Sequence, residues 1–363
     1  MSMELVKAIY NQQSPMLYDE NFYHKALQDI ENDGISSQIY FLLKMLGRIE
    51  QTPVFFQKRL KDTYDQGLYQ NLFIKNQLEL ILRRFEDQGI DVIPIKGVYF
   101  AEKYFGHIGA RATSDIDLLI RQHDLSKAID TVKLLGFTVD GEEIPGHFHS
   151  SFCKEIPHSS IPLVVEIHWN LVKENTANFQ IDDLWNESIS IGSSTHIKEL
   201  SPNHTFYMIC LHGWRHNLDS LKYFLDIIQV IYKHRDELDY EQIFKLAQSH
   251  RTYKRMIRTL SIVYQQFPEL DYMKKFSKKR RKTLWDYRSQ KGFKRYVDFI
   301  DYQFFSYDSF KHSLTEFHNW LWPSRHDLSS ELGLNRQAQS FLKMYLSLYK
   351  KRVTSMIKAL LPH

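Results

Sequence analysis

Cysteine is scarce in this sequence, and long apolar runs are missing. The 363 residues include two cysteines, Cys153 and Cys210, and neither lies in a CxxC or zinc-binding spacing. This excludes a disulfide scaffold and fits a reducing compartment. No apolar run approaches the roughly 20 residues that cross a bilayer, and Met1 to Gln13 lack the apolar stretch of a signal peptide. We therefore expect a cytoplasmic protein that has no membrane partner.

Internal repeats and low-complexity tracts are missing as well, and the composition is ordinary, with 43% hydrophobic and 25% charged residues. At roughly 150 residues per domain, the chain is long enough for two or three units. We expect a helical region over 1–90, a core of strands and helices over 91–200, and a helical substrate-binding region over 201–363.

Apolar periodicity predicts long helices on both sides of this core. From Val54 to Gln88, apolar residues recur at helical spacing as far as Gly89, which fits a helix C-cap. Ser201 and Pro202 mark another helix start. Further helices are expected over 37–49, over 221–234 and over the remainder of the chain to 363, with a break near Pro323.

Between Asp91 and Trp169 the pattern changes to short alternating or apolar runs, which are typical of strands. The expected strands cover 91–95, 115–120, 137–140, 147–154 and 163–169, with short helices over 98–105 and 124–135. With the flanking helices, these elements predict an α+β fold, in which a small core sheet lies between largely helical N- and C-terminal regions.

The segment SDIDLL at 114–119 carries the strongest chemical signal. Alternation places Asp115 and Asp117 on one strand face, and Ile116 and Leu118 on the other. Two neighbouring carboxylates raise each other's pKa unless a cation lies between them, and magnesium prefers such hard oxygen ligands. Asp is also depleted in strands, which argues against a chance exposed face. We expect a magnesium site here, with manganese as the alternative ion.

A second strand supplies a third acid. In LVVEIHW, Glu166 and His168 share one face, and apolar residues occupy the other. A charged residue inside an apolar strand needs a partner. If this strand lies beside the Asp115 strand, three acids converge and can hold metal ions across a transferring phosphate. His147 and His149 also alternate onto one strand face, where a structural role is favoured.

A phosphate-binding turn is indicated by Ile95-Lys96-Gly97, which follows one strand and opens a helix. Glycine lets the backbone approach a phosphate, and helix N-termini favour negative charge. Lys96 can pair with a phosphate oxygen, and Arg111 is the natural second clamp. Ser114 lies in the same loop, directly before the acid pair. Lys96, Gly97, Arg111 and Ser114 are therefore expected to bind a nucleotide.

The later segment LHGWRHNLDSLKYFLDI, at 211–227, carries a further set of polar side chains. His212 and His216 share a helix face, but no third ligand follows, so zinc is not expected. Lys222 and Asp226 are spaced for a surface ion pair. Lining of a nucleotide or acceptor site and structural packing are both open for these histidines. The side chains expected to line the site are His168, His212, Arg215, His216 and Lys222.

Positive charge is concentrated at residues 274–282, where KKFSKKRRK holds seven Lys or Arg in nine positions. Such a run can contact phosphate-bearing partners, so nucleic acid or a protein is one candidate partner. A solvated surface helix or loop is the alternative.

The order of strand, short helix, DxD strand and later acidic strand resembles the polymerase-β-type nucleotidyltransferase superfamily. Within it, IKGVYFAEKYFGHIGARATSDIDLLI followed by VEIHW resembles the bacterial family of uncharacterised nucleotidyltransferases, over about residues 75 to 240 and most closely from Ile93 to Trp169. The resemblance implies that Asp115 and Asp117 match the metal-binding pair and Glu166 the third acid. The superfamily's Gly-Ser phosphate motif is Lys96-Gly97 here, so its serine role is not carried over.

These observations predict a magnesium-dependent nucleotidyltransferase with catalytic Asp115, Asp117 and Glu166. A nucleoside triphosphate is expected along Lys96, Gly97 and Arg111, with magnesium bridging its phosphates. An acceptor hydroxyl or phosphate attacks the α-phosphorus in line, and pyrophosphate leaves. Glu166 either completes the metal site or takes the acceptor's proton.

We expect the acceptor to be a small molecule or a peptide natural product. One alternative is a toxin-like enzyme that modifies protein or RNA and uses the basic run at 274–282. A non-catalytic nucleotide-binding protein is the other alternative, and three converging carboxylates argue against it because a scaffold does not need them.

Overall fold

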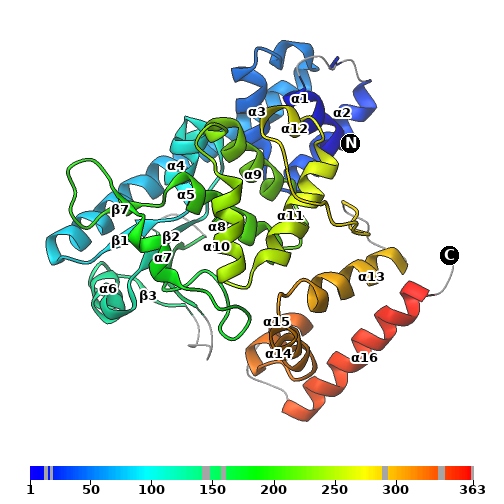
Figure 1. The fold of residues 1–363 in the computed structure, drawn as a ribbon. Coiled ribbons are helices and arrows are strands. Elements are labelled where there is room, and N and C mark those ends of the chain that lie inside the picture. Colours follow the sequence, from blue (N-terminus) through cyan, green and yellow to red (C-terminus); the bar gives the residue numbers. More distant parts are fainter. Residues whose placement is uncertain are drawn as a thin grey trace.

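The computed structural model describes residues 1–11, 15–16, 19–140, 148–156, 161–287, 293–333 and 340–360 (Figure 1). It combines a central five-stranded sheet with helices that precede and follow the sheet in the sequence, which confirms the predicted α+β class. No helix within these ranges is both long and apolar enough to span a membrane.

The sheet has the strand order β1-β2-β5-β4-β3. Its central strands β2 and β5 run parallel, and the other neighbouring pairs are antiparallel. The predicted adjacency of the two acidic strands is therefore confirmed. The strands are β1 (Val92–Pro94), β2 (Asp115–Ile120), β3 (Thr138–Val139), β4 (His149–Lys154) and β5 (Leu163–His168).

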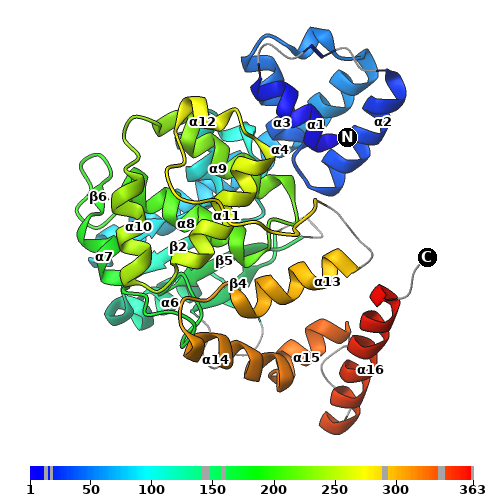
Figure 2. The same cartoon turned by 45° about the vertical axis from the view of Figure 1, so that its right-hand side comes forward.

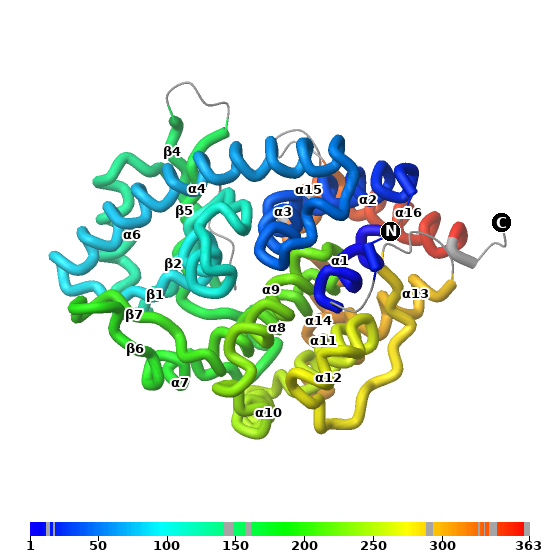
Figure 3. The backbone as a smooth tube through the Cα atoms, turned by 90° about the horizontal axis from the view of Figure 1, so that it is seen from above, coloured from blue at the N-terminus to red at the C-terminus, as the bar shows by residue number. Residues whose placement is uncertain are grey.

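One face of the sheet is apolar and covered by α4 (Val54–Gln88) and α6 (Leu125–Leu134). Ile116 and Leu118 of β2 and Val165 of β5 point into this layer and are buried. The long helix α4 runs from the N-terminal helices to the sheet and ends at Gly89, as predicted (Figure 3). Side chains at alternate positions, including the acids, therefore lie on the opposite face of the sheet.

The opposite face looks toward a second apolar core that joins the N-terminal helices to the helices after the sheet. Residues from the regions 1–90, 91–200 and 201–363 all contribute to this core, and the three-region division stays a prediction. The helices concerned are α1 (Ser2–Tyr10), α2 (Glu20–Asn32), α3 (Ser36–Met45), α7 (Ile181–Asn186), α8 (Pro202–Arg215), α9 (Leu221–His234), α10 (Tyr240–Ser249), α11 (Tyr253–Gln266) and α12 (Leu270–Met273).

The C-terminal helices form a group at the edge of the molecule, below the N-terminal helices (Figure 2). The predicted break near Pro323 is confirmed, since it lies between α14 and α15. The prediction that the whole C-terminal remainder is helical is wrong for residues 274–287, which form neither helix nor strand. The helices are α13 (Phe293–Ile300), α14 (Phe310–Leu321), α15 (Arg325–Leu332) and α16 (Phe341–Leu360).

Candidate active site

Two acids meet at the centre of the sheet. Asp117 of β2 lies directly opposite Glu166 of β5, and because paired residues of neighbouring strands share a face, both carboxylates point toward α8. Asp117 is buried, whereas 26% of the Glu166 side-chain surface is exposed to solvent. Asp115 lies two residues earlier on the same strand face.

His168 joins these two carboxylates. Its Nε2 lies 3.0 Å from Asp117 Oδ1 and 3.2 Å from Glu166 Oε2. His149 of β4 stacks on the His168 ring with centroids 5.0 Å apart, which supports the packing role predicted for it. His147 lies outside the described residues. One imidazole therefore bridges both acids from a position fixed by the sheet.

Lys96 supplies a cation to the same Asp117 oxygen that His168 contacts. It lies at the turn between β1 and α5 (Gly97–Phe100), and its Nζ is 2.7 Å from Asp117 Oδ1. The turn is held against β2 because the backbone N–H of Ile95 donates to the Asp117 carbonyl. The acid on the following helical turn, Glu102, pairs with Lys75. The Lys96 ammonium is thus directed at the acidic cluster.

Gly97 has a backbone reason to be glycine. Its φ is +68°, and an added Cβ would lie 3.3 Å from the Asp115 carbonyl oxygen. A left-handed conformation costs a non-glycine residue about 1–2 kcal/mol, and this close backbone contact adds to that cost. The turn can therefore approach β2 only with glycine at this position.

Replacing Gly97 by Ala is expected to lower the free energy of unfolding by more than about 1–2 kcal/mol, measured by urea denaturation. Gly106→Ala is the matched control, because Gly106 also has a positive φ, +83°, but has no atom within 4 Å of the added Cβ. Equal losses in the two variants would show that the contact with β2 carries no cost.

The charges of the cluster act on its acids in opposite directions. Burial opposes ionisation of Asp117, but the Lys96 ammonium and the hydrogen bond from His168 outweigh it, so the pKa of Asp117 lies well below its ordinary value. Burial and the neighbouring charge of Asp117 raise the pKa of Asp115. Burial opposes ionisation of Glu166, but the hydrogen bond from His168 and the charges of His168 and His149 together lower its pKa.

The donor set fits a divalent cation. Ligand atoms of Asp117, Glu166 and His168 all lie within 4.8 Å of one another. The two carboxylates offer the hard oxygens that magnesium and manganese prefer, whereas an imidazole nitrogen is a more common ligand of iron and later transition metals. The raised pKa of Asp115 indicates a further carboxylate whose charge is not neutralised by the side chains around it.

Arg111 has a partner that the sequence analysis did not identify. Its Nε and Nη2 donate to the two carboxylate oxygens of Asp226, at 2.8 and 2.9 Å, and both side chains are buried. Asp226 therefore does not form the surface pair with Lys222 that was predicted. The expected phosphate contact of Arg111 would have to come from the remaining Nη1 edge of this guanidinium.

The loop before β2 is held by Asn71 of α4, which is fully buried. Its Nδ2 donates to the carbonyls of Ile108 and Arg111, and its Oδ1 accepts from the backbone N–H of Thr113. Asn71 was not among the residues predicted from the sequence. Its position as a polar residue on the apolar face of a long helix could have indicated that it forms buried polar contacts. This side chain sets the position of the loop that leads into the acid pair.

The ends of α8 and α9 supply the remaining expected side chains above this face. His212 is half-buried near Lys96, and desolvation and that positive charge keep its pKa well below the ordinary value. Burial and Arg215 lower the pKa of His216 to about 4. Arg111 and burial lower the pKa of Lys222 to about 8. Both histidines are thus neutral at pH 7, and Ser114 is exposed directly before β2.

Arg215 lies on the last turn of α8, over the ring of Phe148 at 4.8 Å. The negative charges of Glu166 and Asp117 act on it, yet no acid of the described chain forms an ion pair with it. It is the exposed guanidinium of this cluster, whereas Arg111 is the buried one.

The basic run at 274–282 is largely tied to the body of the protein. Lys274 donates to the carbonyl of Arg235, and three further cations pair with acids from different elements. The pairs are Lys278 with Glu241, Arg280 with Asp271, and Arg281 with Asp301. The alternative of a surface loop is therefore the better description of this run.

Comparisons with known proteins identify the family of this chain. A family model described as uncharacterised nucleotidyltransferase matches residues 24–268, which is most of the chain. A search of curated proteins found no significant match. The solution structure of the antibiotic-resistance factor ANT(2'')-Ia is 12% identical and aligns over 49% of this chain and 91% of that chain, with a TM-score of 0.33. By its family match, the chain belongs to the uncharacterised nucleotidyltransferase family and is a transferase.

Proposed function

We propose that the protein transfers a nucleoside monophosphate from a nucleoside triphosphate to an acceptor hydroxyl or phosphate, and that it uses magnesium or manganese. The observation that carries this proposal is the opposed pair Asp117 and Glu166, with Lys96 2.7 Å from Asp117 at a glycine turn. Acids alone would suit many metal sites. Acids flanked by a lysine and a glycine turn suit a phosphate chain bound to metal.

A divalent ion held by Asp115, Asp117 and Glu166 would neutralise charge on the reacting phosphates. Lys96 and Lys222 would hold the phosphate chain, and the lowered pKa of Lys222 reflects the concentration of cations there. The acceptor oxygen forms a bond to the α-phosphorus, the bond to the bridging oxygen breaks, and pyrophosphate leaves with that electron pair. Glu166, which is ionised and more exposed than Asp117, would either complete this metal site or take the acceptor's proton.

The direct test is incubation of the purified protein with each α-labelled triphosphate, a cell extract and either metal. We expect label to appear in an acceptor together with pyrophosphate, and to disappear when EDTA is added. Because the same acids would hold the ion, Asp117→Asn is the control protein. Labelling that persists in Asp117→Asn or in EDTA would overturn the proposal.

Lys96→Ala is expected to weaken binding of a non-hydrolysable triphosphate by about 10- to 150-fold, because a charge-assisted contact is worth roughly 1.5–3 kcal/mol. Isothermal titration calorimetry measures the affinity. Lys75→Ala is the matched control, since Lys75 pairs with Glu102 away from the acids. Unchanged affinity in Lys96→Ala with a lowered melting temperature would assign Lys96 to the scaffold.

A further inference from the structure

A cavity of about 840 Å³ lies beside the candidate active site. One wall is the turn after α8, with Arg215, His216 and Asp219, and the other is formed by residues 284–286 together with α13 and the segment after it. Its size matches the cavities that hold drug-sized molecules.

The cavity opens next to the acidic cluster. Arg215 connects the two places, because it lines the cavity and its guanidinium lies over the Phe148 ring, whose centroid is 6.2 Å from that of His168. A molecule in the cavity would therefore lie near the histidine that bridges Asp117 and Glu166. An acceptor needs such a position, because its attacking oxygen must come close to the reacting phosphate.

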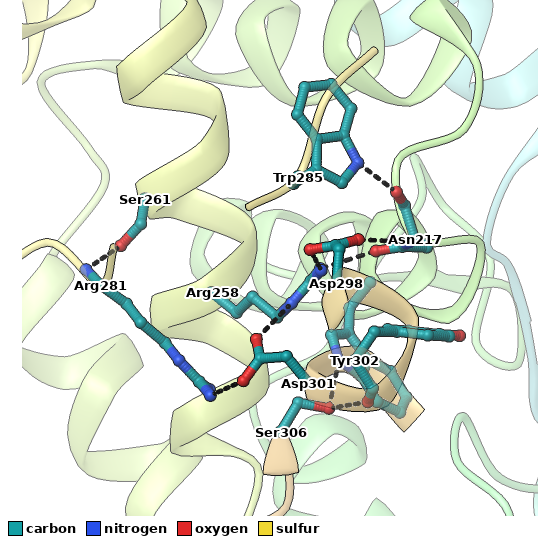
Figure 4. A network of polar contacts seen from close by, with 10 residues as sticks. Asn217, Arg258, Ser261, Arg281, Trp285, Asp298, Asp301, Tyr302 and Ser306 are labelled. Carbon is teal, nitrogen blue, oxygen red and sulfur yellow. Dashed lines mark hydrogen bonds and ion pairs between the residues drawn. The ribbon is translucent and has the colours of Figure 1, made fainter. Parts of the chain in front are cut away.

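The second wall comes from a part of the chain beyond the family match, which ends at residue 268. This wall is nevertheless fixed to the body by buried polar contacts (Figure 4). Arg258 of α11 pairs with Asp298 of α13 at 2.7 Å, and its Nη1 donates to Asn217 Oδ1 at 2.7 Å. The indole N–H of Trp285 donates to the Asn217 carbonyl at 2.8 Å. The wall is thus built into the fold.

Asn217 is also strained. Asn217 and Leu218 have φ values of +50° and +53°, which non-glycine residues rarely adopt, so the surrounding contacts must hold this turn in place. The turn connects α8, which carries Arg215 and His216, to α9, which carries Lys222. This turn therefore connects the cavity wall to the helix that carries Lys222.

The chemistry of the lining indicates the kind of molecule. Trp285 and Phe299 give the cavity aromatic surface. Asp219 and Asp286 are exposed carboxylates that line it, and neither forms an ion pair with another described residue. Two guanidinium groups also line the cavity: Arg295 is engaged with a partner, and Arg215 lies over the Phe148 ring. A cationic group with an adjoining ring would satisfy both features.

We propose that this cavity is the acceptor site and that the acceptor is a small molecule with a protonated amine, a ring and a free hydroxyl. The amine is held by Asp219 and Asp286, the ring lies against the aromatic wall, and the hydroxyl faces Glu166. This assignment rests on the proposed nucleotidyl transfer, and the wall formed by residues 284–286 and 295–302 selects the acceptor.

The test uses ligand-observed NMR on the full chain with two matched pairs of probes, glucosamine with N-acetylglucosamine and tyramine with N-acetyltyramine. We expect the amines to bind at least about tenfold more tightly than the uncharged amides, because only the amines form a charge-assisted contact. In Asp219→Asn/Asp286→Asn this preference should disappear. Asp236→Asn is the matched control, because this aspartate is 92% exposed and does not line the cavity.

Equal binding of amines and amides, no binding of either, or an unchanged preference in the double variant would overturn the assignment. The double variant should keep its melting temperature and its triphosphate affinity, since neither acid touches the phosphate side. Amine binding in a protein that binds no triphosphate would instead overturn the nucleotidyl-transfer function and leave the amine site in place.

Discussion

Asp115→Asn and Asp117→Asn are expected to abolish transfer equally but to change stability in opposite directions. Each removes a carboxylate from the proposed metal site, which should lower the rate at least about a hundredfold, since metal stabilisation of a transition state is worth several kcal/mol. Asp117→Asn should also destabilise the metal-free protein by about 1–3 kcal/mol, because Lys96 and His168 lose a charged partner. Asp115→Asn should make the metal-free protein slightly more stable.

The difference follows from the pKa shifts. Folding lowers the pKa of Asp117, so its carboxylate stabilises the native state at neutral pH, and this contribution is lost as pH falls below the unfolded value of about 3.9. Folding raises the pKa of Asp115, so its carboxylate destabilises the native state above that raised value. The expectation from the sequence alone, that either substitution would relieve repulsion, is therefore revised for Asp117.

Urea denaturation of both variants in EDTA at pH 7 measures the two stabilities, and turnover is measured separately with metal. Conservative Asp→Glu variants at the same positions keep the charge and control for its loss. Destabilisation by Asp115→Asn, or unchanged stability in Asp117→Asn, would contradict the electrostatic description of the cluster.

The strands that carry the acids were predicted with their boundaries nearly correct. The alternation of polar and apolar residues in 115–120 and 163–168 is a local signal. Each strand also has an apolar face that must be buried, so the periodicity and the burial predict the same inward face. The end of α4 at Gly89 was also predicted correctly, because a left-handed helix cap depends on a single residue, which is usually glycine. The family resemblance supplied the order of the motifs, and the family match confirms it.

Partners distant in sequence could not be predicted in the same way. Arg111 and Asp226 are 115 positions apart, and only the packing of α9 against α8 and residues 101–105 brings them together. Asp226 lies in an apolar helix, which signals that it needs a partner but does not name it. The prediction of a helix over residues 274–287 failed for a different reason. The cations of this segment pair with acids on separate elements, and these contacts hold the segment across those elements without helix or strand.

Asp226→Ala is expected to cause the largest loss of stability of any single substitution considered, about 3–5 kcal/mol. The guanidinium of Arg111 would remain buried, with its two hydrogen bonds to Asp226 lost. Phe100, whose ring lies 5.5 Å from that guanidinium, cannot replace a carboxylate. Thermal and urea denaturation in EDTA measure the loss, and Asp219→Asn, an exposed acid near the same helix, should change stability little.

The double variant Arg111→Met/Asp226→Leu separates the structural role of Arg111 in its buried ion pair from its expected role in triphosphate binding. Replacing a buried ion pair by apolar residues of similar volume is often neutral or stabilising, so this protein should recover most of the stability lost in Asp226→Ala. If Arg111 also contacts the triphosphate, the stable double variant should bind it about 10- to 150-fold more weakly than the wild type. Full stability with unchanged triphosphate affinity would show that the pair only supports the loop before β2. Failure to recover stability would contradict the view that the pair is an isolated, replaceable contact.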